Sequence, residues 1–245
     1  MPLDYDCGQS VDSVRRFCGF APAKVNRCGP QILHWGGRES SPRGVFTSRP
    51  QPPNSDIIKT VRVIGGIHRG RTLRTVEGLA VRPTSDRLRE TLFNILSPRI
   101  ARSRFLDICA GSGAVGVEAI SRGAQHTTLI DNSRRACSVI KANLHALGIE
   151  GEAAVINRDA AAALKQLAKE GRQFDIVFFD PPYASDLYGQ VMRLLDEQPL
   201  LPGGGVVIAE HRAKTPPAGR YGRLTMYREV RQGESALAFY AAGEP

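Results

Sequence analysis

Cysteine and aromatic residues are scarce in this 245-residue chain, which has 5 cysteines and 7% aromatic residues. The cysteines form no CxxC pair and no regular framework, so a disulfide-stapled secreted domain and a structural zinc site are both disfavoured, and we expect no bound metal. No uninterrupted apolar run approaches the ~18 residues of a membrane span, so we expect no membrane association. The composition, with 42% hydrophobic and 23% charged residues, indicates a globular protein of the reducing cytoplasm.

Negative charge is nearly missing from one segment, residues 59–104. This segment holds 11 basic and 3 acidic residues, and ten of the basic residues are arginine, so it carries most of the formal net charge of +9. The planar guanidinium of arginine contacts phosphate at two points, and such clustering predicts binding to nucleic acid. A solvated basic face without a partner is the alternative.

Regular periodicity is missing from residues 1–58, which hold 6 glycines and 7 prolines. We therefore expect a disordered arm there, with an upstream start assignment as the alternative explanation. Residues 59–104 follow as a second unit, in which short β-branched runs around Gly65 and Gly66, with a further turn at Arg69 and Gly70, predict a small basic hairpin or meander. The stretch RPTSDRLRETLFNIL at 82–96 then predicts an amphipathic helix that Ser85 can cap.

From residue 105 to 245, strand and helix patterns alternate, which is typical of an α/β fold with a parallel sheet covered by helices on both faces. The predicted strands lie at 105–111, 126–131, 152–159, 174–180, 204–211, 223–232 and 235–242. The last two strands meet at Gly233 and are expected to form an antiparallel hairpin at one edge. The sequence thus predicts a Rossmann-like, mostly parallel, seven-stranded sheet, preceded by the basic hairpin and helix.

A glycine-rich loop, DICAGSGAVG at 107–116, follows the first strand of this sheet. Its glycines permit a tight turn and let a ligand approach the N-terminus of the next helix. Asp131 lies twenty residues after Gly111, at the end of the second strand, where its carboxylate can accept hydrogen bonds from ribose hydroxyls. The same residues also satisfy the dinucleotide pattern GxGxxG, so the loop alone leaves NAD open as the cofactor.

Two aspartates favour S-adenosylmethionine over NAD. Asp107 comes four residues before Gly111, and Asp159 ends the third strand, where it is placed to bind an adenine amino group. The alternative is that both aspartates only cap loops. Cys109 has no evident basic partner and is expected to fill space in the loop, not to act as a nucleophile. The predicted cofactor-binding residues are Asp107, Ala110, Gly111, Gly113, Asp131, Asn132, Asp159 and Ala160.

The fourth strand ends in the most informative motif of the chain, Asp180, Pro181, Pro182 and Tyr183. An exocyclic amino group of a nucleobase is a poor nucleophile because its lone pair is delocalised into the ring. The Asp180 carboxylate and the Pro181 carbonyl could accept hydrogen bonds from its two N–H groups and so localise the lone pair. Tyr183 offers an aromatic face on which an unstacked base can lie. The prediction is methylation of a base amino group; an ordinary Pro-Pro loop is the alternative.

With both loops in place, the chain resembles class I S-adenosylmethionine-dependent methyltransferases and, more narrowly, the bacterial 16S rRNA (guanine(966)-N(2))-methyltransferase family. The resemblance covers about residues 60–242. It is carried by RVIGGIHRGRTL at 62–73, RPTSDRLRETLFNIL at 82–96, DICAGSGAVGVEAISRGA at 107–124, DPPY at 180–183 and GESALAFY at 233–240.

This resemblance implies methylation of a guanine N2 in 16S rRNA, within the 30S subunit or an assembly intermediate, by an enzyme that we expect to be a monomer. It implies that Gly111, Gly113 and Asp131 hold the cofactor, that Asp159 reads its adenine, and that Asp180, Pro181 and Tyr183 handle the guanine. The candidate RNA contacts are His68, Arg69, Arg71, Arg82 and Arg87. For Arg82, Thr84 and Arg87, scaffolding on the cofactor side is an open alternative, and the hairpin residues could equally be exposed turn residues without a partner.

Three other functions compete with this one. A DNA adenine-N6 methyltransferase shares the Asp-Pro-Pro-Tyr motif but usually has a large target-recognition domain, for which the chain after Asp180 has no room. An NAD(P)-dependent oxidoreductase leaves that motif and the basic segment unexplained. A non-catalytic ribosome-assembly factor would not need an intact Asp180.

Overall fold

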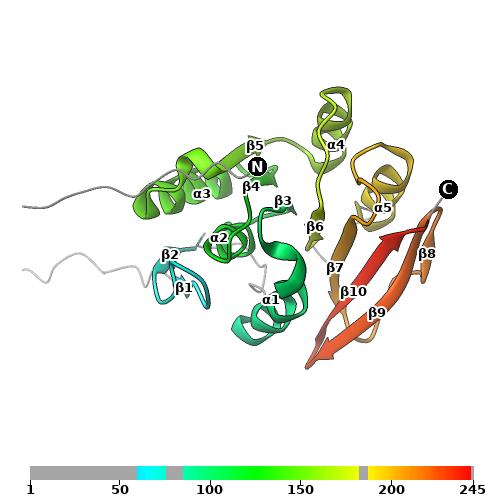
Figure 1. The fold of residues 1–245 in the computed structure, drawn as a ribbon, viewed down its shortest axis with the longest axis horizontal. Coiled ribbons are helices and arrows are strands. Elements are labelled where there is room, and N and C mark those ends of the chain that lie inside the picture. The colour runs from blue at the N-terminus through cyan, green and yellow to red at the C-terminus, as the bar shows by residue number, and fades with distance from the viewer. Residues whose placement is uncertain (1–59, 76–84, 182–186, 244–245) are drawn as a thin grey trace, which may run out of the picture. The chain divides into compact units, whose positions relative to one another are not determined.

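A computed structural model describes residues 60–75, 85–181 and 187–243, all of which belong to one compact unit of the chain (Figure 1). The expected arm at 1–58 lies outside the described residues. Within them, no helix combines the length and the apolar character that crossing a membrane requires.

The described part is built on an eight-stranded sheet of order β5-β4-β3-β6-β7-β10-β9-β8. The parallel strands are β5 (Ala153–Asn157), β4 (His126–Asp131), β3 (Arg104–Ile108), β6 (Ile176–Phe179) and β7 (Val206–Arg212). The antiparallel strands are β10 (Ser235–Ala242), β9 (Leu224–Gln232) and β8 (Arg220–Tyr221). The predicted fold class is confirmed. The sheet has one strand more than the seven expected, because β8, only two residues long and without a pattern to reveal it, pairs with the start of β9.

Helices cover both faces of the sheet, and alternate residues of the strands pack under them. On one face, Phe179 and Ala209 belong to the core beneath α4 (Ala160–Lys169) and α5 (Leu187–Glu197). On the other face, Phe178 and Ile208 pack under α1 (Asp86–Ile100). α2 (Ala114–Ser121) and α3 (Arg134–Leu147) cover the β3 and β4 part of that second face, followed by the short 3-10 helix η1 (Glu150–Glu152). Figure 1 shows α4 and α5 standing together, apart from α1 and α2.

α1 confirms the helix predicted in the basic segment. The Ser85 side chain caps it by accepting a hydrogen bond from the Leu88 amide at 3.2 Å. The helix continues through Pro98 to Ile100, beyond the predicted stretch. A proline removes one hydrogen bond from the last turn, but Ile100 is only 4% exposed, so burial of its side chain stabilises that turn.

The predicted hairpin forms from β1 (Thr60–Arg62) and β2 (Thr72–Arg74), which pair antiparallel. Both predicted turns fall in the one loop between these strands. The loop packs on α2, where the Ile67 amide donates to the Ser121 carbonyl at 2.8 Å. Gly66 has a φ of +75°, and an added Cβ would lie 1.7 Å from the Ser121 carbonyl oxygen, so only glycine fits this contact.

Candidate active site

The glycine-rich loop connects the end of β3 to the start of α2 through several left-handed residues. Cys109, Gly111 and Gly113 have φ values of +63°, +57° and +76°. An added Cβ at Gly111 would meet nothing within 4 Å, whereas one at Gly116 would lie 2.6 Å from a Leu129 methyl. Gly111 therefore leaves open space at the turn, and Gly116 lets α2 approach β4 closely.

Asp107 holds this loop against the helix that follows it. The side chain is 1% exposed, and its Oδ2 accepts a hydrogen bond from the Gly116 amide at 2.9 Å. Burial, together with the nearby charge of Asp131, raises the pKa of Asp107 to about 7, although the Gly116 amide opposes this effect. This hydrogen bond is the loop-capping contact that the sequence analysis names as the alternative to a cofactor contact for Asp107.

Asp131 ties the glycine-rich loop to the end of β4. Its Oδ2 accepts from the Gly111 amide at 2.9 Å, and its Oδ1 accepts from the Ser133 amide at 2.8 Å. Asn132 follows it and is exposed, and Ala110, in the loop, is half-buried. The two backbone amides fix the Asp131 carboxylate at the carboxyl edge of the parallel strands, where ligands bind in open α/β sheets.

Asp159 caps α4, with its Oδ1 accepting from the Ala162 amide at 3.0 Å. Asp159 therefore has the capping role that is the alternative to binding an adenine amino group. Ala160, the next residue, is buried in the core. The charge of Asp159 also raises the pKa of the Cys109 thiol, which indicates that Asp159 lies near the glycine-rich loop.

Cys109 shows that the predicted site residues converge. Burial raises the pKa of its thiol to about 12, and the carboxylates of Asp131, Asp180, Asp107 and Asp159 add to this effect. A nucleophilic cysteine needs its thiolate form. Cys109 stays protonated at neutral pH, which agrees with the prediction that it fills space. Among the described residues, no group of three or more His, Cys, Asp or Glu side chains is arranged to hold a metal ion.

The first half of the Asp-Pro-Pro-Tyr motif lies at the same edge. The Asp180 amide donates to the Ile108 carbonyl at 3.3 Å, which ties the motif to the end of β3, and Pro181 is buried. Pro182 and Tyr183 lie outside the described residues. Burial, followed by the charges of Glu210 and Asp107, raises the pKa of Asp180 well above its usual range.

Glu210 is the residue of this site that the sequence analysis missed. It is 2% exposed and lies in β7, whose parallel register with β6 pairs Phe179 with Ala209 and so brings Glu210 beside Asp180. The stretch GGVVIAEH at 204–211 predicts only a strand. A charged residue at the end of a run that is otherwise apolar was the available signal.

The predicted RNA contacts lie partly away from this edge. The His68 amide donates to the Ser121 hydroxyl at 3.0 Å, and Arg69 is exposed in the hairpin loop beside it. Arg71 is also exposed, and its guanidinium donates to the Ala146 carbonyl at 2.9 Å. Ser121 is the last residue of α2, so these three residues lie at the opposite end of that helix from the glycine-rich loop.

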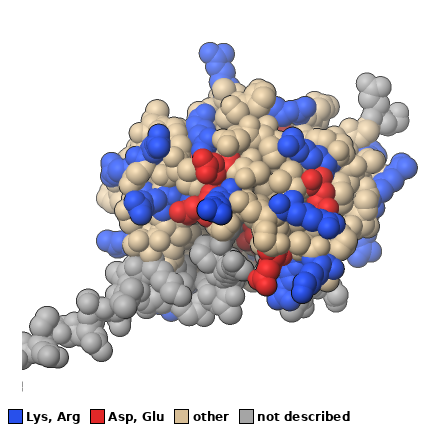
Figure 2. Space-filling view, turned by 90° about the horizontal axis from the view of Figure 1, so that it is seen from below, with Lys and Arg blue, Asp and Glu red and all other residues tan. Residues whose placement is uncertain are grey.

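Arg87 is exposed near the start of α1, and Arg82 and Thr84 lie outside the described residues. Not every arginine of the basic segment is on the surface. Arg89 is 1% exposed and donates to the Arg62 carbonyl at 2.6 Å and to Asp86 at 3.1 Å. Arg104 pairs with Asp175 at 2.9 Å. On the face seen in Figure 2, Lys and Arg side chains are spread widely with Asp and Glu between them, so the basic character there is not one continuous patch.

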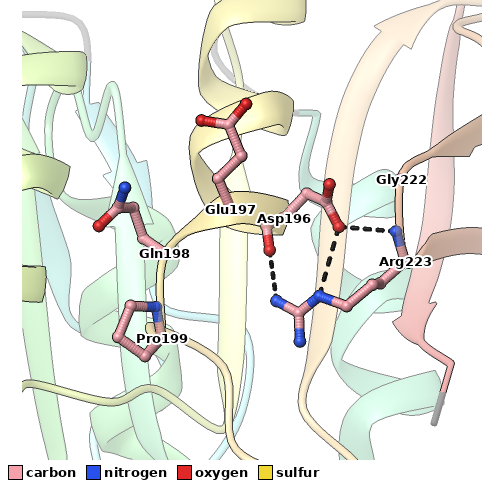
Figure 3. A pocket seen from close by; sticks show the side chains of 6 residues that line it. All are labelled: Asp196, Glu197, Gln198, Pro199, Gly222 and Arg223. Atoms are coloured by element: carbon pink, nitrogen blue, oxygen red, sulfur yellow. Dashed lines mark hydrogen bonds and ion pairs between the residues drawn. The ribbon is translucent and has the colours of Figure 1, made fainter. Parts of the chain in front are cut away.

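A cavity between the end of α5 and the turn before β9 has no part in this site. It is lined by Asp196, Glu197, Gln198, Pro199, Gly222 and Arg223 (Figure 3). The Asp196 Oδ1 accepts from the Arg223 amide at 2.6 Å and pairs with its guanidinium at 3.5 Å. These bonds hold α5 to the β8–β9 turn, and the cavity contains none of the predicted site residues.

Comparison with known proteins supports the predicted family. Residues 61–241 match the family described as Conserved hypothetical protein 95. The protein named Ribosomal RNA small subunit methyltransferase D in Escherichia coli (strain K12) is 36% identical over 188 residues, which are 77% of this chain and 93% of that protein. The protein of the same name in Haemophilus influenzae is 39% identical over 167 residues, 68% of this chain and 85% of that protein.

A solved structure, that of yhhF from Escherichia coli, superposes with a TM-score of 0.66 at 37% identity and covers 76% of this chain and 100% of that one. The resemblance found in the sequence is therefore confirmed, and the chain belongs to the Conserved hypothetical protein 95 family, together with bacterial proteins named as small-subunit rRNA methyltransferases.

Proposed function

We propose that this protein transfers a methyl group from S-adenosylmethionine to N2 of a guanine in 16S rRNA, on the 30S subunit or an assembly intermediate. The observation that carries the proposal is the position of Asp180, at the end of β6 and tied to the end of β3 beside the glycine-rich loop. The names of the relatives in Escherichia coli and Haemophilus influenzae support an rRNA substrate. The choice of guanine N2 rests on the resemblance of the motifs.

The residues at the glycine-rich loop fit S-adenosylmethionine. The carboxylates of Asp131 and Asp159 both act on the Cys109 thiol, and their negative charge beside the glycine-rich loop suits a cationic sulfonium. Asp131 is fixed by two backbone amides where its oxygens can also accept from ribose hydroxyls. Open space in front of Gly111 leaves room for a ligand at the turn. When bound, the cofactor supplies an electrophilic methyl group.

Asp180 and Pro181 then act on the base. The Asp180 carboxylate and the Pro181 carbonyl each accept a hydrogen bond from one N–H group of the amino group. These two hydrogen bonds localise the nitrogen lone pair as the nitrogen becomes tetrahedral. The nitrogen gains the methyl group and must lose one proton, which the Asp180 carboxylate can take. Burial and the charges of Glu210 and Asp107 raise the pKa of Asp180, which makes its carboxylate a stronger proton acceptor than an exposed aspartate.

The direct test uses S-adenosylmethionine with a labelled methyl group. The protein is incubated separately with undermethylated 30S subunits, naked 16S rRNA and duplex DNA, and the labelled nucleoside is identified. We expect label in N2-methylguanosine from the 30S sample. Label in N6-methyladenine from DNA would replace guanine with adenine as the target base. The absence of label from every substrate would favour the non-catalytic assembly factor.

A variant separates the role of Asp180 from that of the cofactor site. Asp180→Ala should reduce transfer by at least about 100-fold, as expected for loss of one preorganised transition-state contact, while cofactor affinity changes little. Calorimetry with S-adenosylmethionine and the labelled-methyl assay measure the two effects. Asp131→Ala is the matched control and should weaken cofactor binding. Equal loss of affinity and rate in Asp180→Ala would contradict the assignment.

A further inference from the structure

A second group of basic residues, outside the segment 59–104, lies in the antiparallel part of the sheet. Residues 212–232, which include β8 and β9, hold six basic residues and one acidic residue. Residues 105–210, which precede them, hold nine basic and thirteen acidic residues. The six basic residues are Arg212, Lys214, Arg220, Arg223, Arg228 and Arg231. The edge of the sheet formed by β9 and β8 is therefore more basic than the α/β part before it.

The arginines of this edge differ in whether an acid within the protein already binds them. Arg223 and Arg231 each pair with a neighbouring acidic side chain, at 3.5 Å and 2.8 Å. Arg228 is exposed, and no ion pair joins it to any residue that the structure describes. Its positive charge is therefore available to a negatively charged partner.

A β-bulge in β9 places an exposed aromatic ring beside Arg228. The register between β9 and β10 shifts after Phe239, whose partner is Arg228, so Tyr227 is the extra residue of the bulge. The Tyr227 and Phe239 ring centroids are 6.2 Å apart, and the Arg228 guanidinium carbon lies 6.0 Å from the Phe239 centroid. Tyr227 is nevertheless 55% exposed. Packing against Phe239 therefore fixes the Tyr227 ring on this face of the sheet and leaves much of it open to a ligand.

The strand register places Tyr227 and Arg228 within reach of the catalytic edge. Arg228 lies in a row of paired residues that crosses β10 and β7 to Phe178 of β6, two residues before Asp180. β9 and β6 are three strand spacings apart, so about 14 Å separates Arg228 from Phe178. Stacked nucleotides rise by about 3.4 Å along one strand, so a stretch of about five nucleotides is long enough to join the two places.

α1 lies beside β9 on this face and adds a further basic side chain. The Thr91 hydroxyl donates to the Gln232 side-chain oxygen at 3.4 Å, and Figure 1 shows the arrowhead of β9 pointing towards α1. Arg87 comes four residues before Thr91, so it lies on the same side of the helix, and it is exposed. This candidate RNA contact therefore lies near the end of the strand that carries Tyr227 and Arg228.

An exposed aromatic ring next to an arginine matches the chemistry of unpaired RNA, in which bases stack on aromatic side chains and phosphates bind guanidinium groups. An enzyme that modifies a base amino group also needs that base unstacked, which favours a target within an unpaired stretch. We propose that Tyr227 and Arg228 form a further RNA-binding site, in which the Tyr227 ring stacks on an unpaired base near the target guanine and Arg228 binds an adjacent phosphate. The inference rests on the methyl transfer proposed above and adds a substrate contact from the C-terminal strands.

Binding to undermethylated 30S subunits at several salt concentrations tests the two side chains separately. Tyr227→Ala should weaken binding by roughly 5- to 150-fold, the range expected for loss of one base–aromatic stack, with an unchanged salt slope. Tyr227→Phe keeps the ring and should bind within about twofold of wild type. Arg228→Gln should reduce the slope of log affinity against log salt by about 1. Arg193→Gln on α5, which covers the other face of the sheet, is the matched control and should keep the wild-type slope.

Two further measurements separate an RNA contact from a structural role. In the labelled-methyl assay, Tyr227→Ala should raise KM for the 30S subunit and leave kcat unchanged, because the lost contact acts equally before and during transfer. Thermal melting and cofactor binding establish that each variant is folded. Should Tyr227→Ala not fold, Tyr227→Leu takes its place with the same expectation, since leucine keeps an apolar contact with Phe239 but offers no ring.

A photoreactive benzophenone side chain at position 227 identifies the partner directly. Irradiation with 30S subunits should crosslink it to 16S rRNA within about five nucleotides of the methylated guanine. A crosslink to a ribosomal protein would assign this surface to a protein partner and overturn the proposal.

The outcomes distinguish this site from the proposed function. If wild type neither binds nor methylates 30S subunits, the proposed function fails and the site fails with it. If wild type methylates them while Tyr227→Ala and Arg228→Gln bind as tightly as wild type, the site is overturned and the methyl transfer stands. An equal loss of affinity in Tyr227→Phe and Tyr227→Ala would likewise exclude stacking on the ring.

Discussion

Asp107 makes the stability of this protein depend on pH. Burial raises its pKa to about 7, whereas in the unfolded chain an aspartate has a pKa near 4. The contribution of the protonated group to stability is complete below about pH 4 and is lost as the pH rises towards 7, because the folded state then holds an unfavourable buried charge. A shift of this size corresponds to about 4 kcal/mol once the pH is above both values.

Asp107→Asn should remove this dependence. The asparagine side-chain oxygen can still accept from the Gly116 amide, so the loop keeps its contact while the charge is lost. Urea unfolding without cofactor, at pH 5 and at pH 8, measures the effect. The variant should gain about 2 to 3 kcal/mol relative to wild type between the two values. Parallel pH profiles for the two proteins would show that Asp107 does not titrate in this range.

The residues of the site differ in how far the sequence could reveal them. The glycines, Asp131 and Asp180 stand in motifs whose spacing follows from the chemistry, and the structure brings them to one edge. Glu210 belongs to no local motif and becomes visible only through the register of β7 with β6. Arg89 likewise counts as part of the basic segment in the sequence, yet it is buried. Burial and register depend on contacts between distant segments, which one sequence does not specify.

At the level of elements, the hairpin is held to α2 by a buried acid. The Glu118 carboxylate is 0% exposed and accepts from the amides of Ile64 and Gly65, both at 2.7 Å, and from Arg122 at 2.7 Å. The sequence predicted the hairpin from its glycines and β-branched residues, but nothing local indicated which helix it would pack against. The structure explains Gly66 as the point of closest approach between the two elements.

Two glycines of the hairpin loop provide a matched pair for testing this packing. Gly66 and Gly70 have φ values of +75° and +84°, but an added Cβ meets the Ser121 carbonyl at 1.7 Å only at Gly66 and nothing within 4 Å at Gly70. Either alanine should cost about 1 to 2 kcal/mol for the left-handed backbone. Gly66→Ala should in addition break the bond from the Ile67 amide to Ser121.

Hydrogen exchange of the Ile67 amide is the appropriate measurement, because the hairpin can open locally without global unfolding. Exchange should accelerate at least about tenfold more in Gly66→Ala than in Gly70→Ala, corresponding to about 1.4 kcal/mol of additional opening. Similar acceleration in the two variants would mean that α2 does not restrain the loop.

At the scale of the whole molecule, only some of the arginines in the basic segment are free of ion pairs and exposed where a nucleic acid could contact them. Arg89 and Arg104 are engaged in ion pairs, whereas Arg69 is exposed at the hairpin loop. Arg69→Gln should weaken binding to 16S rRNA and reduce the slope of log affinity against log salt by about 1, if Arg69 contacts one phosphate. Filter binding at several salt concentrations measures the slope. Arg193→Gln on α5, also exposed, is the control, and an unchanged slope for Arg69→Gln would exclude a phosphate contact there.

The length of α2 determines the minimum length of an RNA that contacts both the glycine-rich loop and the hairpin loop. The eight residues from Ala114 to Ser121 span ~12 Å, with the glycine-rich loop at one end and the hairpin loop at the other. An RNA that contacts both the glycine-rich loop and Arg69 must therefore span at least the ~12 Å length of this helix. A short oligonucleotide and a folded ribosomal particle would then differ in affinity even when both present the same guanine.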